Sequence, residues 1–467
     1  MASSIVSSNL TSGFIDLATF DELEKYMYGT AQAITYFVRE TRKSTWFTQV
    51  PTVLSRGSGT ADFNQEWSAN ITRAGDYLLQ VWLRFDLPSV TLQNTQAYTN
   101  YGLRWTRNVG HNLIRESSVT FNDLSAARLD NYFLDFWTAF TTPAGKQVGY
   151  NNMIGNVSSL IMPSGPGVAI PSATLNVPLP FFFTRDTGVS LPTAALPYND
   201  MKIQVWFRDW TELLIVDNFA AAAGTNPSRP ATQADLSSGT PVLSNVYMWS
   251  NYAIVSNDER KRMGCAPRDI LMEQVQTAPI QTWQPAQNPY PSYDIRFSHA
   301  IKVLFFAVRN TTTSSERSNY VNTSPVPVSV GYVNFSPPTP SATDPILNTS
   351  LIYENTARLS YMGSDYFSLI QPYYQPNWNV VIPAVTGYHM YSYSLDFYAC
   401  DPKGSTNFGK LTNVSIVPGA TPFAISAANG TLASPGGTYP QTYSFITVGV
   451  NNNIIRVSGG ALGFPVL

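Results

Sequence analysis

The chain has 467 residues, more than one ordinary hydrophobic core accommodates, so two or three globular domains are expected. Its 28 Lys and Arg against 30 Asp and Glu give a net charge of −2, which disfavours direct nucleic-acid binding through a basic face. Charged residues make up 12% of the chain, about half the usual share, and aromatic residues 13%, which favours β-structure. Low charge protects weakly against association, so the chain is expected either to be insoluble or to associate as its function.

Residues 1–30 are predicted to form an N-terminal arm. Residues 1–12 are small and polar and are expected to be extended. A capping box follows, with Thr19 as the predicted N-cap and Glu22 bonding back to it, and Gly29 is expected to end the helix. No basic stretch precedes an apolar run here, so no signal peptide is predicted, and no segment is apolar for long enough to cross a bilayer.

The predicted arm helix carries Phe20, Leu23 and Met27 on one face. A narrow apolar stripe of this kind either packs on its own domain or binds a partner, and both interpretations stay open. These three residues are the candidate contact residues of the chain.

From Thr35 onward, period-two runs predict one strand after another. In Met201–Phe207 the odd residues are predicted to face a core, and so are the odd residues of Tyr77–Phe85 and of Tyr391–Phe397. The other predicted strands are Arg115–Asn122, Leu175–Phe183, Val246–Val255, Ile270–Gln276, Ile301–Arg309, Leu351–Asn355 and Phe445–Val457. Many strands without alternating helices predict all-β sandwiches or barrels.

Two pairs of similar segments indicate an internal duplication. Leu191–Phe207 and Ile382–Phe397 both place an apolar residue before Pro, then a tyrosine, a methionine and an alternating strand. Phe121–Leu129 and Tyr353–Leu359 share an aromatic residue, two polar residues and an Ala-Arg-Leu run. The pairs occur in the same order, which favours a duplicated domain over a short solenoid repeat.

The charged run Asn257–Met263 is predicted to be a helix at the junction of the two copies. The predicted domains are therefore the arm, a first sandwich over residues 31–256 and a second over residues 257–467.

The sequence offers little for catalysis. His111, His299 and His389 are far from one another and from Cys265 and Cys400, so no zinc spacing appears. No phosphate-binding loop or local carboxylate pair is present, and two cysteines cannot form a disulfide framework. We predict no enzyme, no cofactor and no catalytic or metal site. Three alternatives stay open: a Ser-His-Asp triad assembled around His299, a carbohydrate-binding sandwich with a distant carboxylate pair, and a membrane-bound scaffold, for which no anchor is seen.

Several motifs together resemble the major capsid proteins of iridoviruses, most of all those of the invertebrate iridescent viruses. The first-half motifs are FIDLATFDELEKYMYG, WFTQVP, RAGDYLLQVWLRFDLP, RWTRN, HNLIRE and LPFFFTRDTGVSLPTAALPYND. The second-half motifs are IRFSHAIKVLFFAVRN, MGSDYFSLI, GSTNFGKLTNVS and NNNIIRVSGGALGFPVL. The resemblance runs nearly end to end.

This resemblance implies a double jelly roll, two eight-stranded antiparallel sandwiches in tandem. It implies that three chains form a pseudo-hexagonal capsomer, and that capsomers tile an icosahedral shell around the membrane-enclosed double-stranded DNA genome of a large virus. The implied partners are neighbouring capsomers, minor capsid and cement proteins, a penton protein and, beneath the shell, the inner viral membrane. The implied location is the virion, after assembly in the host cytoplasm.

Overall fold

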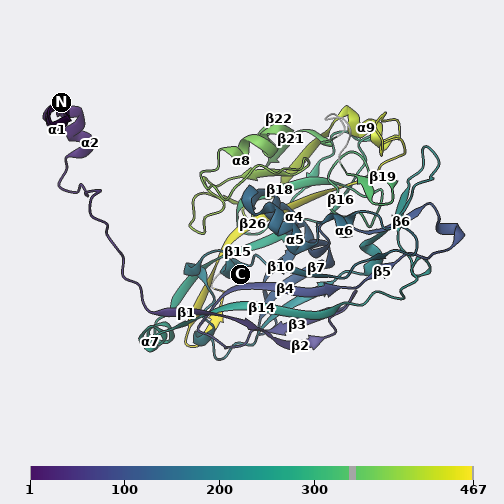
Figure 1. Ribbon diagram of the computed structural model, residues 1–467, viewed down its shortest axis with the longest axis horizontal. Coiled ribbons are helices and arrows are strands. Elements are labelled where there is room, and N and C mark those ends of the chain that lie inside the picture. The colour runs from purple at the N-terminus through teal and green to yellow at the C-terminus, as the bar shows by residue number, and fades with distance from the viewer. Residues whose placement is uncertain (1, 336–342, 465–467) are drawn as a thin grey trace. The chain divides into compact units, whose positions relative to one another are not determined.

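A computed structural model of the chain describes residues 2–335 and 343–464, which divide into two compact units, Met1–Trp46 and Phe47–Leu467. Every described strand lies in the second unit (Figure 1). These strands pair in antiparallel sheets that build two β-sandwiches. The predicted all-β class is therefore confirmed.

The first unit contains two helices, α1 (Ala2–Ala18) and α2 (Glu22–Tyr28). The prediction that residues 1–12 are extended is wrong for residues 2–12, which are helical. Apolar residues at positions i, i+4 and i+7, which begin within the Ser- and Asn-rich run and continue past it, favour a helix. The residues with this spacing are Leu10, Phe14 and Leu17.

The predicted capping box is also wrong, because its residues cap two different helices. The Thr19 hydroxyl donates to the carbonyl of Asp16 at 2.9 Å, at the end of α1. Asp21 is the N-cap of α2, and its carboxylate accepts from the backbone N–H of Glu22 at 2.8 Å. Gly29 ends α2 as predicted.

The first sandwich consists of two sheets with the order β1-β14-β4-β10 and β2-β3-β11-β7-β8. We set β2 aside as an added edge strand and number the other eight strands of these two sheets 1 to 8 in chain order. The sheet orders are then 1-8-3-6 and 2-7-4-5. The strands are β1 (Phe47–Val53), β2 (Ser55–Gly59), β3 (Glu66–Asn70), β4 (Tyr77–Leu87), β7 (Ile114–Phe121), β8 (Leu124–Asp130), β10 (Ala173–Pro178), β11 (Met201–Phe207) and β14 (Ser244–Val255).

The second sandwich repeats this topology. Its sheets have the order β15-β26-β18-β23 and β17-β25-β21-β22, which are again 1-8-3-6 and 2-7-4-5 in chain order. The strands are β15 (Arg268–Thr277), β17 (Tyr293–Asp294), β18 (Ala300–Asn310), β21 (Ile346–Tyr353), β22 (Thr356–Gly363), β23 (His389–Ser392), β25 (Val414–Ala420) and β26 (Tyr443–Ser458). Two eight-stranded sandwiches of this order are two jelly rolls.

Helices and short sheets fill the connections. The predicted helix at Asn257–Met263 is confirmed as α7 (Asn257–Cys265), between the jelly rolls in the chain. The other described α-helices are α3 (Val109–Leu113), α4 (Asn131–Thr141), α5 (Ala144–Ile154), α6 (Ser158–Ile161), α8 (Gln371–Tyr373) and α9 (Pro422–Ala428), and η8 (Tyr366–Ile370) is a π-helix. The short 3-10 helices are η1 (Gln96–Tyr98), η2 (Phe182–Thr184), η3 (Thr187–Val189), η4 (Thr193–Ala195), η5 (Trp210–Glu212) and η6 (Gln233–Asp235). The short strands are β5 (Val90–Thr91), β6 (Tyr101–Trp105), β9 (Ala169–Ile170), β12 (Leu214–Asn218), β13 (Ser228–Pro230), β16 (Gln281–Trp283), β19 (Val326–Ser329), β20 (Tyr332–Asn334), β24 (Thr406–Asn407) and β27 (Ala461–Gly463).

One of the two sequence repeats is a structural repeat. In both jelly rolls a two-residue turn joins strands 4 and 5, with Asn122-Asp123 in the first and Glu354-Asn355 in the second. All four residues have positive φ, between 45° and 64°, as a type I′ turn requires. The backbone N–H of the first turn residue donates to the carbonyl just before strand 7 in each half, Asp200 at 2.8 Å and Asn413 at 2.9 Å.

The other repeat matches strands that are not equivalent. Met201–Phe207 is strand 7 (β11), whereas Tyr391 lies in strand 6 (β23). The odd residues of β11 are buried as predicted, but β23 ends at Ser392, and the predicted inward Leu395 is 80% exposed while Ser394 is buried. The Ser392 hydroxyl donates to the Ser394 carbonyl at 2.8 Å, a local turn that breaks the alternation.

In β4 the inward face changes partway along the strand. Val81, Leu83 and Phe85 are buried as predicted, but the predicted inward Tyr77 and Leu79 are half-buried and Leu78 is buried instead. A bulge in the pairing with β14 shifts the register there and turns the other face inward.

The two jelly rolls pack against each other through one face of each. Strand β8 of the first lies against β15 of the second, where Gln274 donates to the carbonyl of Ala126 at 2.9 Å. In β18, Leu304 and Phe306 point into the core of the second sandwich, whereas Val303 and Phe305 belong to the core that continues into the first. The 1-8-3-6 sheet of the second jelly roll is therefore covered on both faces. Helices α4 and α5 lie between the two sets of strands in Figure 1.

Candidate functional site

The predicted contact residues of the arm are exposed within their own unit. Phe20 is 47% exposed, Leu23 64% and Met27 57%. Leu23 and Met27 lie one turn apart on α2, and Phe20 precedes its N-cap. None of the residues of α2 is buried, so this unit leaves the stripe open for contact.

An aromatic cluster fixes the junction of the two jelly rolls. Helix α4 of the first jelly roll places Phe136, Trp137 and Phe140 on Phe305 of β18, with ring centroids 5.5 to 6.4 Å apart. Trp137 also stacks on Tyr398, which follows strand 6 of the second jelly roll, at 6.0 Å. These contacts bury aromatic surface at the junction and favour one relative position of the two sandwiches.

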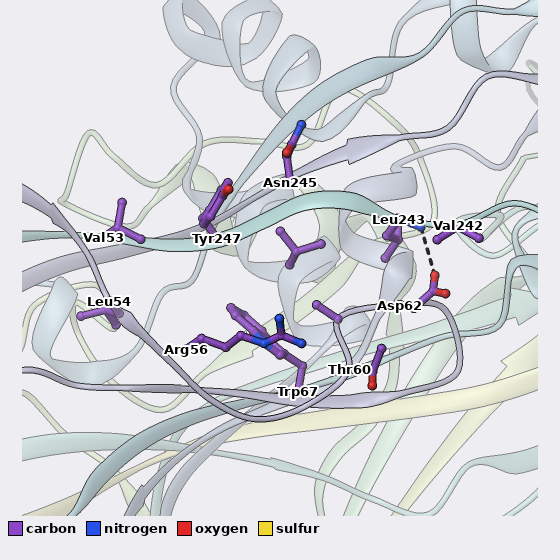
Figure 2. A pocket seen from close by; sticks show the side chains of 12 residues that line it. Val53, Leu54, Arg56, Thr60, Asp62, Trp67, Val242, Leu243, Asn245 and Tyr247 are labelled. Atoms are coloured by element: carbon purple, nitrogen blue, oxygen red, sulfur yellow. Dashed lines mark hydrogen bonds between the residues drawn. The ribbon is translucent and has the colours of Figure 1, made fainter.

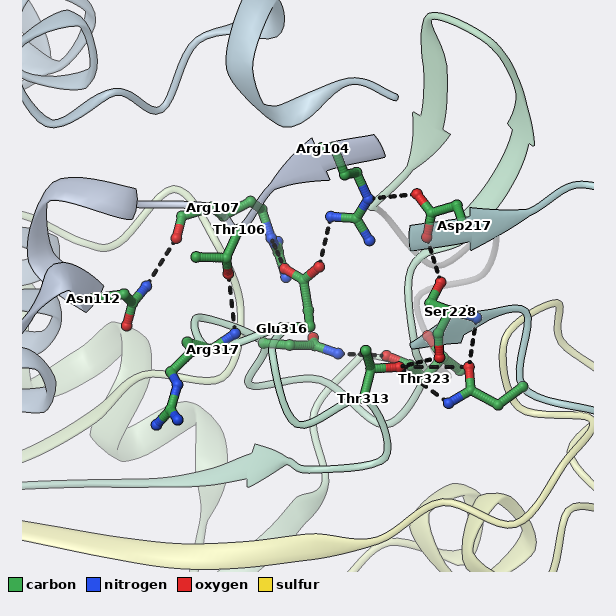
Figure 3. Close-up of polar contacts among 12 residues, drawn as sticks. Arg104, Thr106, Arg107, Asn112, Asp217, Ser228, Thr313, Glu316, Arg317 and Thr323 are labelled. Atoms are coloured by element: carbon green, nitrogen blue, oxygen red, sulfur yellow. Dashed lines mark hydrogen bonds and ion pairs between the residues drawn. The ribbon is translucent and has the colours of Figure 1, made fainter. Parts of the chain in front are cut away.

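A buried ionic cluster also links segments of the two jelly rolls (Figure 3). Arg104 on β6 pairs through Nε with Asp217 on β12 at 2.6 Å and through Nη1 with Glu316, from the connection after β18, at 2.7 Å. Arg107 holds the other Glu316 oxygen at 3.1 Å, and the Ser228 hydroxyl donates to Asp217 at 2.6 Å. Isolated charges would be costly here, so the four ionic groups depend on one another.

The pKa of Glu316 reflects this environment. Burial works to raise the pKa of the carboxyl group, but the attraction of Arg104 and Arg107 outweighs it and lowers the pKa below its ordinary value. Glu316 is therefore charged at neutral pH. Since Arg104 belongs to the first jelly roll and Glu316 to the second, the cluster joins the two jelly rolls.

Asp135 on α4 makes a second polar link between the jelly rolls. Its carboxylate is 2.8 Å from Nδ1 of His111 and accepts from the hydroxyls of Ser318 at 2.7 Å and Tyr320 at 3.0 Å. The other ring nitrogen of His111 lies 2.5 Å from the hydroxyl of Tyr150, whose pKa burial and the Asp135 charge raise. Asp135, His111 and Ser318 are buried, so this network is a structural one.

A serine, a histidine and an aspartate do meet, but around His389 and not around His299. The Ser364 hydroxyl and the Asp344 carboxylate both contact Nε2 of His389, at 2.7 Å and 2.9 Å. In a hydrolytic triad the carboxylate binds the opposite ring nitrogen and orients the base. Among the described residues Nδ1 of His389 is buried and has no hydrogen-bond partner, so no carboxylate orients the ring as the general base of such a triad.

The described residues contain no metal-binding cluster, no disulfide and no membrane-spanning helix. In residues 2–335 and 343–464 no group of three or more His, Cys, Asp or Glu side chains could hold a metal ion. Cys265 and Cys400 are free thiols. Of the helices described, none is both long and apolar enough to span a membrane.

A cavity of about 570 Å³ opens at the edge of the first sandwich (Figure 2). Its walls come from the end of β1, from β2 and β3, and from β14, and they include Arg56, Trp67 and Tyr247. The carboxylate of Asp62 accepts from the backbone N–H groups of Phe63 at 2.8 Å and Leu243 at 3.0 Å. Asp62 therefore orders the loop and is poorly placed to act as a free base.

The outer face of the 1-8-3-6 sheet in the first jelly roll carries an apolar row across all four strands. Register places Val53, Trp249, Trp82 and Pro178 side by side. The two indole rings stack at 6.2 Å with an interplanar angle of 12°. Neither tryptophan is fully buried, and Val53 is exposed. An apolar row on an open sheet face indicates an interface.

The second jelly roll exposes an uncharged aromatic segment between strands 5 and 6. Residues 369–378 contain no Asp, Glu, Lys or Arg. The large apolar side chains exposed there are Leu369, Ile370, Tyr373, Tyr374 and Trp378. We call these five residues the aromatic segment.

Sequence reasoning missed these surfaces for different reasons. Arg104 and Glu316 are 212 residues apart, and no local pattern connects them. Trp82, by contrast, occupies the polar side of the alternation in Tyr77–Phe85, and a tryptophan on that side was a readable sign of an interface on the outer face.

The comparisons with known proteins agree with this architecture. The family model "Major capsid protein N-terminus" matches residues 35–255, and "Large eukaryotic DNA virus major capsid protein" matches residues 259–463. The chain is 63% identical to the major capsid protein of Costelytra zealandica iridescent virus, over 99% of this chain and all of that protein. It is also 63% identical to the major capsid protein of Wiseana iridescent virus, over 98% of this chain and 94% of that one.

The fold also matches a solved capsid. The chain superposes on a quasi-atomic model of the PBCV-1 virus capsid with a TM-score of 0.70 and 18% identity, over 93% of this chain and all of the other. This likeness confirms the predicted double jelly roll. The chain belongs to the major capsid protein family of large eukaryotic DNA viruses, among the proteins of the iridescent viruses, and is a structural subunit of a virion capsid.

Proposed function

We propose that three copies of the chain form a pseudo-hexagonal capsomer, and that capsomers tile an icosahedral shell. One observation carries the proposal: the two jelly rolls have the same topology, but the chain satisfies only one of the two interfaces that such a pair can make. Within the chain, the side of the first jelly roll that carries strand 5 packs on the 1-8-3-6 sheet of the second. In the described part of the chain, β22 on the strand 5 side of the second jelly roll and β1 on the 1-8-3-6 sheet of the first stay largely exposed.

A contact between two different faces is heterologous, and copies joined by such contacts form either a closed ring or an open filament. If each copy repeats its internal contact toward the next copy, three chains present six similar jelly rolls around one axis. A ring of this kind fits a hexagonal lattice and uses both open faces.

The proposed domains remain the arm at 1–30, the first jelly roll at 31–256 and the second at 257–467. Two observations support the second boundary: α7 lies between β14 and β15, and the family models meet between residues 255 and 259. For the arm, the first compact unit extends to Trp46 and contains no strand among its described residues.

The proposed partners are neighbouring capsomers, minor capsid and cement proteins, a penton protein and, beneath the shell, the inner membrane. The exposed Phe20, Leu23 and Met27 support a role for the arm in the contacts below the shell. A net charge of −2 supports the absence of direct nucleic-acid binding. We further propose that the chain has no catalytic activity and that assembly takes place in the host cytoplasm.

The test is the native mass of the purified chain, measured by light scattering after size exclusion. A stable species of about three times 51.5 kDa is expected, with a hexagonal outline in negative stain. A single-chain mass at every concentration, or turnover that one carboxylate substitution abolishes, contradicts the proposal.

A further inference from the structure

The contact of α4 inside the chain has a definite place in jelly-roll topology. Helix α4 follows strand 5 of the first jelly roll. Its Trp137 lies against Phe305 on strand 3 and against Phe397 and Tyr398, which follow strand 6, of the second. A helix after strand 5 therefore docks in the corner between strands 3 and 6 of the next jelly roll.

The same corner of the first jelly roll is an open cavity of about 650 Å³. Its walls include Trp82 on strand 3 and Pro178 to Pro180 at the end of strand 6, with Met153 and Tyr398 at the sides. This corner corresponds to the site that holds Trp137 in the second jelly roll. Trp137 itself lies in the cavity wall, and no described residue fills the cavity as Trp137 fills the corner of the second jelly roll.

The counterpart of α4 in the second jelly roll is the aromatic segment. It also follows strand 5, as the turns η8 and α8 and the residues after them. Phe367 and Pro372 are buried and hold these turns on their own sandwich. Leu369, Ile370 and Tyr373 point outward, and Trp378 is 91% exposed. The segment thus presents exposed aromatic and aliphatic side chains, and the one ring contact that its aromatic residues make with a described residue is between Tyr373 and Tyr374, at 5.2 Å.

We propose that the aromatic segment of one copy docks in the strand 3–strand 6 cavity of the next copy, as α4 docks within the chain. The inference rests on the proposed trimer and names the side chains that would close it. The partner we commit to is a second copy of this chain.

The charges agree with this choice of partner. The ionic group in the cavity wall, Arg185, is already engaged: it lies 3.8 Å over the ring of Trp137 and pairs with Glu273 at 2.9 Å. A charged ligand would find no free counter-charge there, whereas residues 369–378 carry none. An uncharged, aromatic occupant fits a wall of tryptophan, proline and methionine.

Two variants separate the two sides of the contact. Tyr373→Asp/Tyr374→Asp charges the segment at two exposed positions, and Asn176→Trp fills the cavity from an outward position on β10. Each should weaken self-association by roughly 100-fold or more and leave folded single chains. The control, Val328→Asp in the β19–β20 hairpin, changes an exposed apolar residue outside the segment and the cavity wall and should form trimers like the parent.

A mixture of the two variants gives the sharpest result. One variant keeps a working cavity and the other a working segment, so together they should form one-to-one dimers of about twice 51.5 kDa, although neither associates alone. Native mass spectrometry measures this directly, and melting curves that match the control exclude misfolding. Should the aspartate variant unfold, Tyr373→Ser/Tyr374→Ser takes its place.

The outcomes distinguish this inference from the proposed function. Variants that remain trimers alongside a trimeric parent overturn the docking of the aromatic segment and leave the capsomer proposal standing. A parent that never exceeds one chain overturns both.

Discussion

The third strands of the two jelly rolls, β4 and β18, have the same place in the topology and opposite surroundings. In β4 buried and half-exposed residues alternate over most of the strand, with one face toward the core and the other outward. In β18 every residue after the first is buried, because the first jelly roll covers its outer face. The contrast lies in the packing and not in the strand pairing.

This difference shows how a duplicated fold can encode assembly. One copy of the sandwich has its outer face covered by its twin, through Phe305 and the aromatic residues of α4. The other copy keeps a row of Val, Trp, Trp and Pro on the equivalent face. A closed ring of copies requires such a pair of faces: the face of the second jelly roll is covered within the chain, and the equivalent face of the first is left for a neighbouring copy to cover.

A charge on each of these outer faces gives the largest contrast. Phe305→Asp buries an unpaired carboxylate in the junction, at a cost of several kcal/mol, comparable to the whole stability of a domain. Gln80→Asp places the same group on the exposed outer side of β4, in the wall of the strand 3–strand 6 cavity, and should leave the single chain folded and soluble. Soluble yield and thermal melting measure both, and equal tolerance of the two changes is incompatible with a covered face on β18.

The two predicted alternations provide the next comparison. Val205→Asp, in a fully buried position of β11, should give insoluble protein. Leu395→Asp should be tolerated because Leu395 is 80% exposed, whereas Ser394→Asp should cost about 1–3 kcal/mol because Ser394 is buried in a hydrogen-bonded turn. Urea unfolding of the soluble variants tests the order. A Leu395 variant less stable than the Ser394 variant restores the alternation that the sequence suggested.

The segments Met201–Phe207 and Tyr391–Phe397 show what local sequence patterns could and could not predict. Met201–Phe207 could be predicted because one sheet face and a regular ladder decide all its positions. The Asn122-Asp123 turn and its Glu354-Asn355 counterpart could be matched because two-residue turns impose residue types locally. At Tyr391–Phe397 the same period failed, because side-chain hydrogen bonds to the backbone ended the strand after Ser392.

The sequence could not show which sheet has its outer face covered by the other jelly roll. Ile301–Arg309 and Tyr77–Phe85 were both predicted as strands, but whether an outer face is covered depends on segments that arrive from far along the chain. The meeting of Arg104 with Glu316, 212 residues apart, follows from the docking of two domains. The candidate site lies mainly in such long-range contacts, so the resemblance to a family, and not periodicity, carried the functional prediction.

The ionic cluster at the junction should give an intermediate effect that depends on pH. Glu316→Gln leaves Arg104 and Arg107 short of a counter-charge in a buried place and should cost about 3 kcal/mol at pH 7. The folded pKa of Glu316 is lowered from 4.5, so its contribution is complete above that value and is lost as the pH falls through the folded pKa. The difference in melting temperature between parent and variant should therefore shrink from pH 6 to pH 3.

The exposed pair of Asp269 and Arg456, on the second jelly roll, is the matched control. Asp269→Asn should change the melting temperature little at pH 7, because solvent screens such a pair. A Glu316 variant that behaves like the Asp269 variant at every pH means that the junction does not depend on its buried charges.

Removing the arm should have the smallest effect on folding. Both β4 and β18, like every other described strand, lie in the second compact unit, and the arm lies in the first. Deletion of residues 1–28 removes α1 and α2 and no strand. The truncated chain should therefore form trimers and melt within about 2 °C of the parent. Shell assembly should fail or become irregular, because the deletion removes the apolar stripe of Phe20, Leu23 and Met27 that is proposed to bind a partner beneath the shell.

Substitutions within the arm distinguish the stripe from the rest of the segment. Phe20→Ser/Leu23→Ser should reproduce the assembly defect at lower severity, each change removing roughly 1.5–3 kcal/mol of burial in the assembled shell. Lys25→Gln alters the same helix but not the stripe, and should assemble normally. Light scattering of the trimer and electron microscopy of the particles give separate answers. A truncated chain that no longer forms trimers places the arm within the fold, and one that forms trimers and builds regular particles makes the stripe dispensable.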